Sequence, residues 1–359
     1  MPKLLIVDDS ALMRKCLGDV FKAEGDFDVS FARNGAEALA MARSIAPDVI
    51  TLDVNMPEMD GITCLSRIMV ECPKPVVMVS SITSEGAEVT LQALSLGAVD
   101  FVPKPDGTVS LHIDKIKREL VAKVRSAARA RISQSRGLLE RVRNRAQPVE
   151  SPKHSAGSAR TGAGTAAGPV KGVVLIGVST GGPGAIETVL PRLPSNFPWP
   201  ILIAQHMPES FTGVFARRIN GLSEIEVVEV TRPMPLRGGV AYIGRGDADF
   251  QVGLRGGVLT AIPYPASPQH NWHPSVERLV ASALEHVAPE QLLGVMLTGM
   301  GNDGAAAMAE LRSRGGRTIA ESEDTAVVWG MPGELVKLGG ATLVLPIERV
   351  SDQLRRWTN

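Results

Sequence analysis

A serine between an apolar run and a cluster of glycines is the first candidate for chemistry. The stretch IGVSTGGPGA, residues 176–185, fits the pattern G-x-S-x-G with Gly177, Ser179 and Gly181. Such a bend can present a nucleophilic hydroxyl clear of a sheet, because small neighbours permit the strained turn. It can also cradle a phosphate, although the lysine of a Walker loop and the full dinucleotide spacing are missing. The motif alone leaves both readings open.

A base and a carboxylate elsewhere in the chain favour the nucleophile. His206 follows an apolar run in AQHMP, and Asp303 lies in MGNDGAA after a later one. Singly, the histidine would more often be structural and the aspartate a helix N-cap. Together they predict a triad in which Asp303 orients His206 and His206 takes the proton of Ser179. The amides of Thr180 and Met300 would form the oxyanion hole. The chain order Ser, His, Asp differs from that of α/β-hydrolases and implies another fold.

Polar residues also follow the strand-like runs of the first third of the chain. They are Asp8, Asp9, Asp53, Ser80 and Lys104. Any one of these aspartates could cap a helix, but the whole set at successive strand ends predicts an aspartyl-phosphate site. Crowded carboxylates favour a hard cation such as Mg²⁺, which takes oxygen ligands. Lys104 would pair with the phosphate oxygens, and Ser80 would donate a hydrogen bond to one of them.

Apolar strand-like runs alternate with helical patterns in both halves of the chain. The runs lie at 4–7, 49–52, 76–79 and 100–103, with FDVSFA less clear, and then at 172–178, 201–205, 226–230, 240–244, 292–299 and 342–345. This alternation predicts an α/β fold with parallel sheets, whose functional groups gather at the carboxyl ends of the strands. We expect two doubly wound domains, the first flavodoxin-like and the second a Rossmann-like three-layer α/β/α domain.

A change of composition separates the two halves. Basic residues dominate positions 115–145, and a stretch rich in Ser, Ala, Gly and Pro follows. With few large apolar side chains to bury, this stretch is expected to be a flexible tether. The basic run is interpreted as a solvated helix end rather than a nucleic-acid contact, because no aromatic residue interleaves it. We therefore expect domains at 1–125 and 170–359, joined by a linker at 126–169.

The composition excludes several classes of protein. The chain has 359 residues with 44% hydrophobic content, enough for two cores, and its 38 basic residues balance 38 acidic ones. This balance gives no reason to expect nucleic acid or an anionic membrane as a partner. Cys16, Cys64 and Cys72 have no metal-site spacing and are expected to be reduced packing residues. Their odd, sparse count favours a cytoplasmic protein. No apolar run is long enough to span a bilayer, so we expect a soluble protein.

The motifs of the first half resemble the receiver domains of response regulators. VDDS, DVNMPEMDG, VMVSS and FVPKP carry this resemblance over roughly the first 125 residues. It implies that Asp53 accepts phosphate from a histidine kinase. It also implies that Asp8, Asp9 and the Asn55 carbonyl hold Mg²⁺ beside Asp53. Phe101 occupies the position of the switch aromatic in such domains.

The second half resembles the catalytic domain of the chemotaxis protein-glutamate methylesterase family. IGVSTGG, AQHMP, LTGMGNDGAA and HPSVERL, residues 273–279, carry the resemblance. It implies a carboxylic ester hydrolase with Ser179 as nucleophile, His206 as base and Asp303 as orienter. The expected substrates are glutamate γ-methyl esters, and certain glutamines, on chemoreceptor helices. The reaction needs no cofactor, and we expect a monomer whose triad the receiver occludes until it is phosphorylated.

Two other functions fit parts of the sequence. The second half could be a binding module whose glycine turn holds an anionic metabolite, although His206 and Asp303 argue against it. The basic segment could contact DNA or RNA, which would make binding strongly salt-dependent. Trp272 and the other tryptophans are interpreted as packing residues. Met207 and Met300 are core residues by default but lie where a substrate entrance would form.

Overall fold

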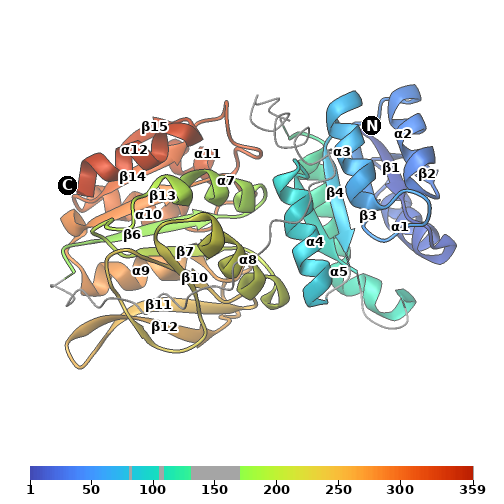
Figure 1. The fold of residues 1–359 in the computed structure, drawn as a ribbon. Helices are drawn as coiled ribbons and strands as arrows, with labels where there is room; N and C mark the ends of the chain where they lie inside the picture. Colours follow the sequence, from blue (N-terminus) through green and yellow to red (C-terminus); the bar gives the residue numbers. More distant parts are fainter. Residues whose placement is uncertain (81–82, 105–108, 131–169, 359) are drawn as a thin grey trace.

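The protein folds into two α/β domains (Figure 1). The structure is a computed structural model and describes residues 1–80, 83–104, 109–130 and 170–358. Most of the predicted linker, 131–169, therefore lies outside the described residues, and the expectation that it is a flexible tether stays a prediction. Among the described residues, no helix combines the length and apolar character needed to cross a bilayer.

The first domain is a parallel five-stranded sheet of order β2-β1-β3-β4-β5 covered by helices. Its strands are β1 Lys3–Val7, β2 Asp28–Ala32, β3 Val49–Asp53, β4 Val76–Ser80 and β5 Asp100–Pro103. Its helices are α1 Ala11–Glu24, α2 Gly35–Ser44, α3 Gly61–Glu71, α4 Ser84–Ser95 and α5 Val109–Ala127. This strand order is the flavodoxin-like order, so the predicted fold is confirmed. Helix α5 runs past the expected boundary at residue 125.

The second domain is built on a parallel seven-stranded sheet of order β15-β14-β13-β6-β7-β10-β8. The strands are β6 Val173–Val178, β7 Ile201–Gln205, β8 Glu226–Val230, β10 Val240–Gly244, β13 Leu292–Met296, β14 Arg317–Glu321 and β15 Leu343–Leu345. The helices are α7 Gly182–Val189, α8 Glu209–Leu222, α9 Val276–His286, α10 Ala305–Ser313, α11 Met331–Lys337 and α12 Ile347–Thr358, with short 3₁₀ turns η1 Leu190–Arg192 and η2 Pro289–Gln291. The Rossmann-like α/β prediction is confirmed.

The order of the strands reverses around β6. The chain passes from β6 to β7 on one side, whereas β13 returns to pair with β6 on the other side. In doubly wound sheets the ligand crevice forms at such a switch point, outside the carboxyl ends of the strands. The residues that follow β6, β7 and β13 therefore lie at the same edge of the sheet, at the carboxyl ends of these strands.

A small antiparallel sheet was not expected from the sequence. It consists of β9 Met234–Pro235, β11 Ala248–Arg255 and β12 Val258–Pro265, in the order β11-β12-β9. Gly256 and Gly257 connect β11 to β12, and both have positive φ, 57° and 78°. A two-residue turn with positive φ at both positions favours a tight hairpin, so the Gly-Gly pair was a usable signal.

The two domains pack against each other. Helix α4 contacts α7 and α8, and Figure 1 shows α4 facing α8. The ring of Phe101 in β5 lies 4.3 Å, centroid to centroid, from the ring of Phe211 in α8. Thr180 Oγ1 donates a hydrogen bond to Asp100 Oδ2 at 2.5 Å. The receiver-like domain thus contacts the residue that directly follows the candidate nucleophile.

Candidate functional site

The turn after β6 fixes the position of Ser179. Gly181 begins α7 with φ 78°, and a Cβ there would lie 2.7 Å from the Cβ of Val327. A Cβ on Gly182 would lie 2.0 Å from Oε1 of Gln205. Side chains do not fit at these distances, so the glycines are needed for the close approach of the turn to its neighbours. Ser179 itself is only partly buried.

The backbone of Ser179 is held on both sides by neighbouring strand ends. Its amide donates to the carbonyl of Thr298 at 3.0 Å. Its carbonyl accepts from Gln205 Nε2 at 3.0 Å and from the amide of Gly182 at 2.8 Å. The main chain of the serine is therefore fixed, while its side chain keeps rotational freedom.

His206 lies across from the serine, one position beyond the end of β7. Val178 and Gln205 are register partners, and the amide of His206 donates to the carbonyl of Val178 at 3.1 Å. Gln205 Nε2 also donates to the His206 carbonyl at 3.0 Å, so it links the two residues through their main chains. The parallel register thus places Ser179 and His206 side by side.

The structure joins His206 to Asp303. His206 Nε2 lies 2.9 Å from Asp303 Oδ2, and both side chains are more than nine-tenths buried. His206 Nδ1 is buried and has no hydrogen-bond partner among the described residues. The ring is therefore not hydrogen-bonded to Ser179 Oγ. Of the predicted triad, two members are in contact, and the third lies on the adjoining strand end.

Asp303 is held by the first turn of α9. It accepts hydrogen bonds from the amides of Val276 at 2.7 Å and Glu277 at 3.2 Å, and from Ser275 Oγ at 3.1 Å. Burial would raise the pKa of Asp303, but the hydrogen bond from His206 and the two amides outweigh it, so the pKa is lowered. A helix N-terminus also favours a negative charge. The carboxylate is therefore ionised and fixed in orientation.

A second buried carboxylate supports this turn. Asp249 in β11 accepts from His273 Nδ1 at 2.9 Å, from the Ser275 amide at 2.8 Å and from Arg278 at 2.5 Å. Burial would raise the pKa of Asp249, but these hydrogen bonds lower it. Asp249 was not predicted as a supporting residue, because it lies in the hairpin that was not expected. His273, which showed no metal partner set in the sequence, is bound to this carboxylate.

Trp272 and the candidate oxyanion residues surround the histidine and the serine. The ring of Trp272 stacks on that of His206 with 6.1 Å between centroids and 12° between planes. The amides of Thr180 and Met300, predicted to form the oxyanion hole, donate to no acceptor within the described part of the chain. Trp272, interpreted as a packing residue, thus packs directly on the candidate base.

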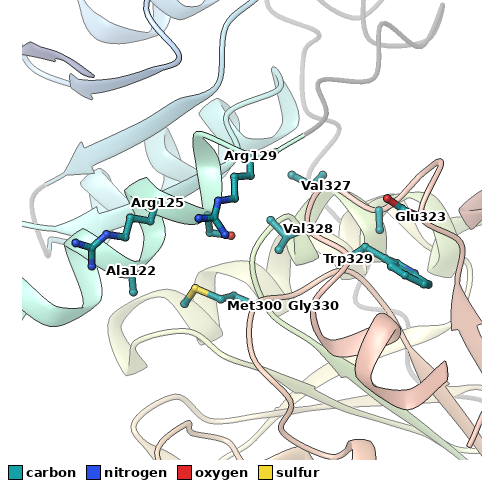
Figure 2. A pocket seen from close by; sticks show the side chains of 11 residues that line it. Ala122, Arg125, Arg129, Met300, Glu323, Val327, Val328, Trp329 and Gly330 are labelled. Atoms are coloured by element: carbon teal, nitrogen blue, oxygen red, sulfur yellow. The ribbon is translucent and has the colours of Figure 1, made fainter. Parts of the chain in front are cut away.

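A pocket of about 530 Å³ lies between the two domains beside Met300. Figure 2 shows Ala122 and Arg125 of α5, with Arg129 just after this helix, on one side and Met300 with the loop from Glu323 to Gly330 on the other. Arg125 also pairs with Glu24 and Asp26 of its own domain. The candidate active site therefore borders a hollow that both domains line.

The acidic residues of the first domain come together as predicted. Carboxylate oxygens of Asp8, Asp9 and Asp53 lie within 4.8 Å of one another. Lys104 Nζ lies 2.7 Å from Asp53 Oδ2 and 3.0 Å from Asp8 Oδ2. The amide of Asn55 donates to Asp53 Oδ1 at 3.3 Å. A set of three carboxylates fits the oxygen ligands that Mg²⁺ prefers.

The charges in this cluster are strongly coupled. Burial raises the pKa of Asp53, with a further contribution from Asp8, although Lys104 acts in the opposite sense. Burial would lower the pKa of Lys104, but its contacts with Asp53 and Asp8 raise it, so the ammonium stays charged. The cluster has more negative groups than one ammonium can balance.

The contacts described for Ser80 and Phe101 are made with residues outside this cluster. Ser80 Oγ donates to the Gly86 carbonyl at 3.3 Å and accepts from Thr90 Oγ1 at 2.7 Å, so these bonds tie it to α4. Phe101 is 3% exposed and packs on Phe211 of the other domain. The Nζ of Lys123 lies 5.0 Å from its ring centroid. The predicted switch aromatic is therefore part of the domain interface.

Comparison with known proteins identifies the family of each domain. Residues 174–354 match the family described as CheB methylesterase, and residues 4–114 match the response regulator receiver domain. The sequence is 58% identical over 357 residues to protein-glutamate methylesterase/protein-glutamine glutaminase 3 of Rhodospirillum rubrum, covering 99% of this chain and 96% of the relative. It is 41% identical over 356 residues to the protein of the same description from Archaeoglobus fulgidus, covering 99% and 97%.

A solved structure matches the second domain. The crystal structure of the CheB methylesterase catalytic domain of Thermotoga maritima has a TM-score of 0.50 and 34% identity, and the match covers 52% of this chain and 97% of that chain. The identity extends over nearly the whole length of the sequence in the relatives above. The chain therefore belongs to the CheB methylesterase family, with a response regulator receiver domain at its N-terminus.

Proposed function

We propose that this protein hydrolyses glutamate γ-methyl esters on chemoreceptor helices and deamidates certain receptor glutamines. The observation that carries the proposal is the buried His206–Asp303 pair at the strand ends next to Ser179. Relatives over nearly the whole chain are named protein-glutamate methylesterase/protein-glutamine glutaminase, which supports the same substrates. We expect it to act in the cytoplasm as a monomer.

The first half of the reaction forms an acyl-enzyme. With His206 Nε2 bound to Asp303, Nδ1 is the nitrogen left to take the proton of Ser179. Ser179 Oγ then attacks the ester carbonyl carbon, and the carbonyl oxygen gains the negative charge. The amides of Thr180 and Met300 would stabilise this oxyanion, a contribution of about 10² to 10³ in rate per donor. His206 returns its proton to the leaving oxygen, and methanol departs.

The second half releases the product. Water attacks the acyl carbon while His206 takes one of its protons, and the proton then returns to Ser179 Oγ as the acyl bond breaks. The product is a glutamate carboxylate. A glutamine side chain would follow the same steps with ammonia as the leaving group. Because Asp303 stays ionised, it stabilises the imidazolium that forms in both halves.

We also propose that phosphorylation of Asp53 relieves inhibition by the first domain. A histidine kinase would supply the phosphoryl group, and Asp8, Asp9, Asp53 and the Asn55 carbonyl would hold Mg²⁺. The bound ion would neutralise charge on the phosphoryl oxygens. Lys104 would change partners, from the carboxylates to the phosphate.

The domain interface supports a direct route of inhibition. Asp100 accepts a hydrogen bond from Thr180, whose amide is a proposed oxyanion donor. Asp100 also accepts from the Phe101 amide at 2.7 Å and pairs with Lys123 Nζ at 3.2 Å. Because Asp100 and Phe101 lie on β5, which leads to Lys104, a rearrangement at the phosphate site can reach the nucleophile turn through one strand.

The test is methanol release from methylated receptor, with and without a small phosphodonor. Ser179→Ala should abolish release, whereas Ser313→Ala, an exposed serine at the end of α10, should leave it unchanged. Release that survives Ser179→Ala would contradict the proposed nucleophile. A wild-type protein that releases no methanol under either condition would favour an anion-binding module instead.

A further inference from the structure

A buried carboxyl outside the proposed triad lies at the end of β14. Glu321 is 1% exposed, and no Lys, Arg or His in the described part of the chain acts on its charge. A buried acid without a cation is costly when ionised and needs hydrogen bonds to be accommodated. The hydrogen bonds of Glu321 therefore identify the part of the structure that it stabilises.

Glu321 binds the main chain directly after β13. Its Oε2 accepts from the amide of Thr298 at 2.8 Å, and its Oε1 accepts from Thr325 Oγ1 at 3.0 Å. The pairing of β13 with β14 ends at Met296, so the amide of Thr298 has no strand partner and takes the carboxyl instead. Both oxygens are used, which fixes the rotamer of Glu321.

Thr298 connects this carboxyl to the nucleophile turn. Its carbonyl accepts from the amide of Ser179 at 3.0 Å. Its hydroxyl donates to the carbonyl of Thr180 at 2.9 Å and accepts from the amide of Val328 at 3.0 Å. One residue thus separates Glu321 from the proposed nucleophile and from the proposed oxyanion donor.

The surroundings of Glu321 favour its neutral form. Burial raises its pKa to about 7, Glu348 raises it further, and the bonds from Thr298 and Thr325 lower it. Among the described residues of β13, β15, α10, α11 and α12, which pack on β14, Glu348 at the start of α12 is the charged group that acts on it. The side chain therefore changes charge near neutral pH.

We propose that Glu321 is a positioning residue that holds Ser179 and Thr180 in their catalytic geometry through Thr298. This role rests on the proposed esterase function. Glu321 does not touch the substrate. Both of its oxygens act as acceptors, so loss of the carboxyl would leave the amide of Thr298 without its partner and loosen the bonds from Thr298 to both residues.

The experiment measures kcat and KM of the full chain for methanol release from methylated receptor at saturating phosphodonor. Glu321→Leu removes both acceptors at similar size, and we expect kcat to fall about tenfold or more with little change in KM. Glu321→Gln keeps an acceptor for the Thr298 amide and should restore most of kcat. A wild-type kcat for Glu321→Leu, or an equal loss in Glu321→Gln, would overturn the proposal.

A further variant keeps the proposal testable if Glu321→Leu does not fold. Thr298→Val retains the main-chain bonds but loses the hydroxyl that binds the Thr180 carbonyl. We expect a lower kcat and an unchanged KM, and an unchanged kcat would contradict the connection. Failure of the esterase function itself is distinct, because wild type would then release no methanol at any pH.

Discussion

Replacement of Thr180 by valine tests the contact between the domains most directly. The change is nearly isosteric and removes only the hydroxyl that donates to Asp100 Oδ2 at 2.5 Å. Asp100 Oδ1 keeps its bonds to the Phe101 amide and to Lys123, so the carboxylate stays compensated. We call the arrangement in which the two domains pack against each other the closed state, and the arrangement in which they separate the open state. The substitution therefore weakens the closed state while the receiver domain remains intact.

The size of the effect follows from the charge on the acceptor. A hydrogen bond to a charged group contributes about 1.5 to 3 kcal/mol. Since about 1.4 kcal/mol corresponds to a factor of ten, the closed state should lose roughly ten- to hundredfold in population relative to the open state. The Phe101–Phe211 contact and the packing of α4 on α8 remain, so the closed state is weakened rather than abolished.

The assay is methanol release from methylated receptor without phosphodonor, compared with the rate at saturating phosphodonor. Thr180→Val should raise the ratio of the unstimulated to the stimulated rate about tenfold or more, up to a ratio of one. Thr180→Ser keeps the hydroxyl and is the matched control. An unchanged ratio in Thr180→Val would show that this hydrogen bond does not hold the inactive state.

Three other perturbations have defined outcomes. Asp303→Asn should lower kcat for methanol release by a factor of about 10³ to 10⁴, because His206 loses the charge that stabilises its protonated form. A decrease in kcat smaller than about tenfold would contradict the triad. Asp53→Asn, or chelation of Mg²⁺ in wild type, should abolish stimulation by phosphodonor and leave the unstimulated rate unchanged, and stimulation that persists in Asp53→Asn would place the phosphate elsewhere. The folded protein retains a proton on Glu321 up to about pH 7 while the unfolded chain releases it near its ordinary 4.5, so stability should decline by up to about 3 kcal/mol as pH rises through this window. Urea unfolding at pH 5 and pH 8.5 should show this decline in wild type and a smaller one in Glu321→Gln.

The strands that carry the sites were predictable because their apolar runs are short, continuous and followed by polar residues. Ser179, His206 and Asp303 were predicted as candidates in this way, as were the acidic residues of the first domain. Their convergence follows from the parallel topology alone. The strand predicted over 292–299 ends at Met296, because Glu321 takes the Thr298 amide in place of a strand partner.

The supporting residues could not be predicted in the same way. Asp249 lies on a hairpin whose alternating pattern was missed, and its role depends on contact with the start of α9. In the sequence Glu321 looks like an ordinary polar residue at a strand end. Only its burial in the structure shows that it contacts the core near the nucleophile turn. Such roles depend on contacts between distant segments, which no local pattern contains. The same holds for Phe101, whose partner Phe211 comes from the other domain.

The position of Phe101 links the two domains in both directions. Its buried ring packs between Phe211 and Lys123, so we expect that the ring reorients only when the domains shift. If a phosphoryl group on Asp53 loosens the catalytic domain, as proposed, thermodynamic reciprocity requires that domain to disfavour the phosphorylated form by the same factor. The catalytic domain would then oppose phosphorylation of its own receiver, and the isolated receiver should hold phosphate more readily than the same receiver in the whole chain.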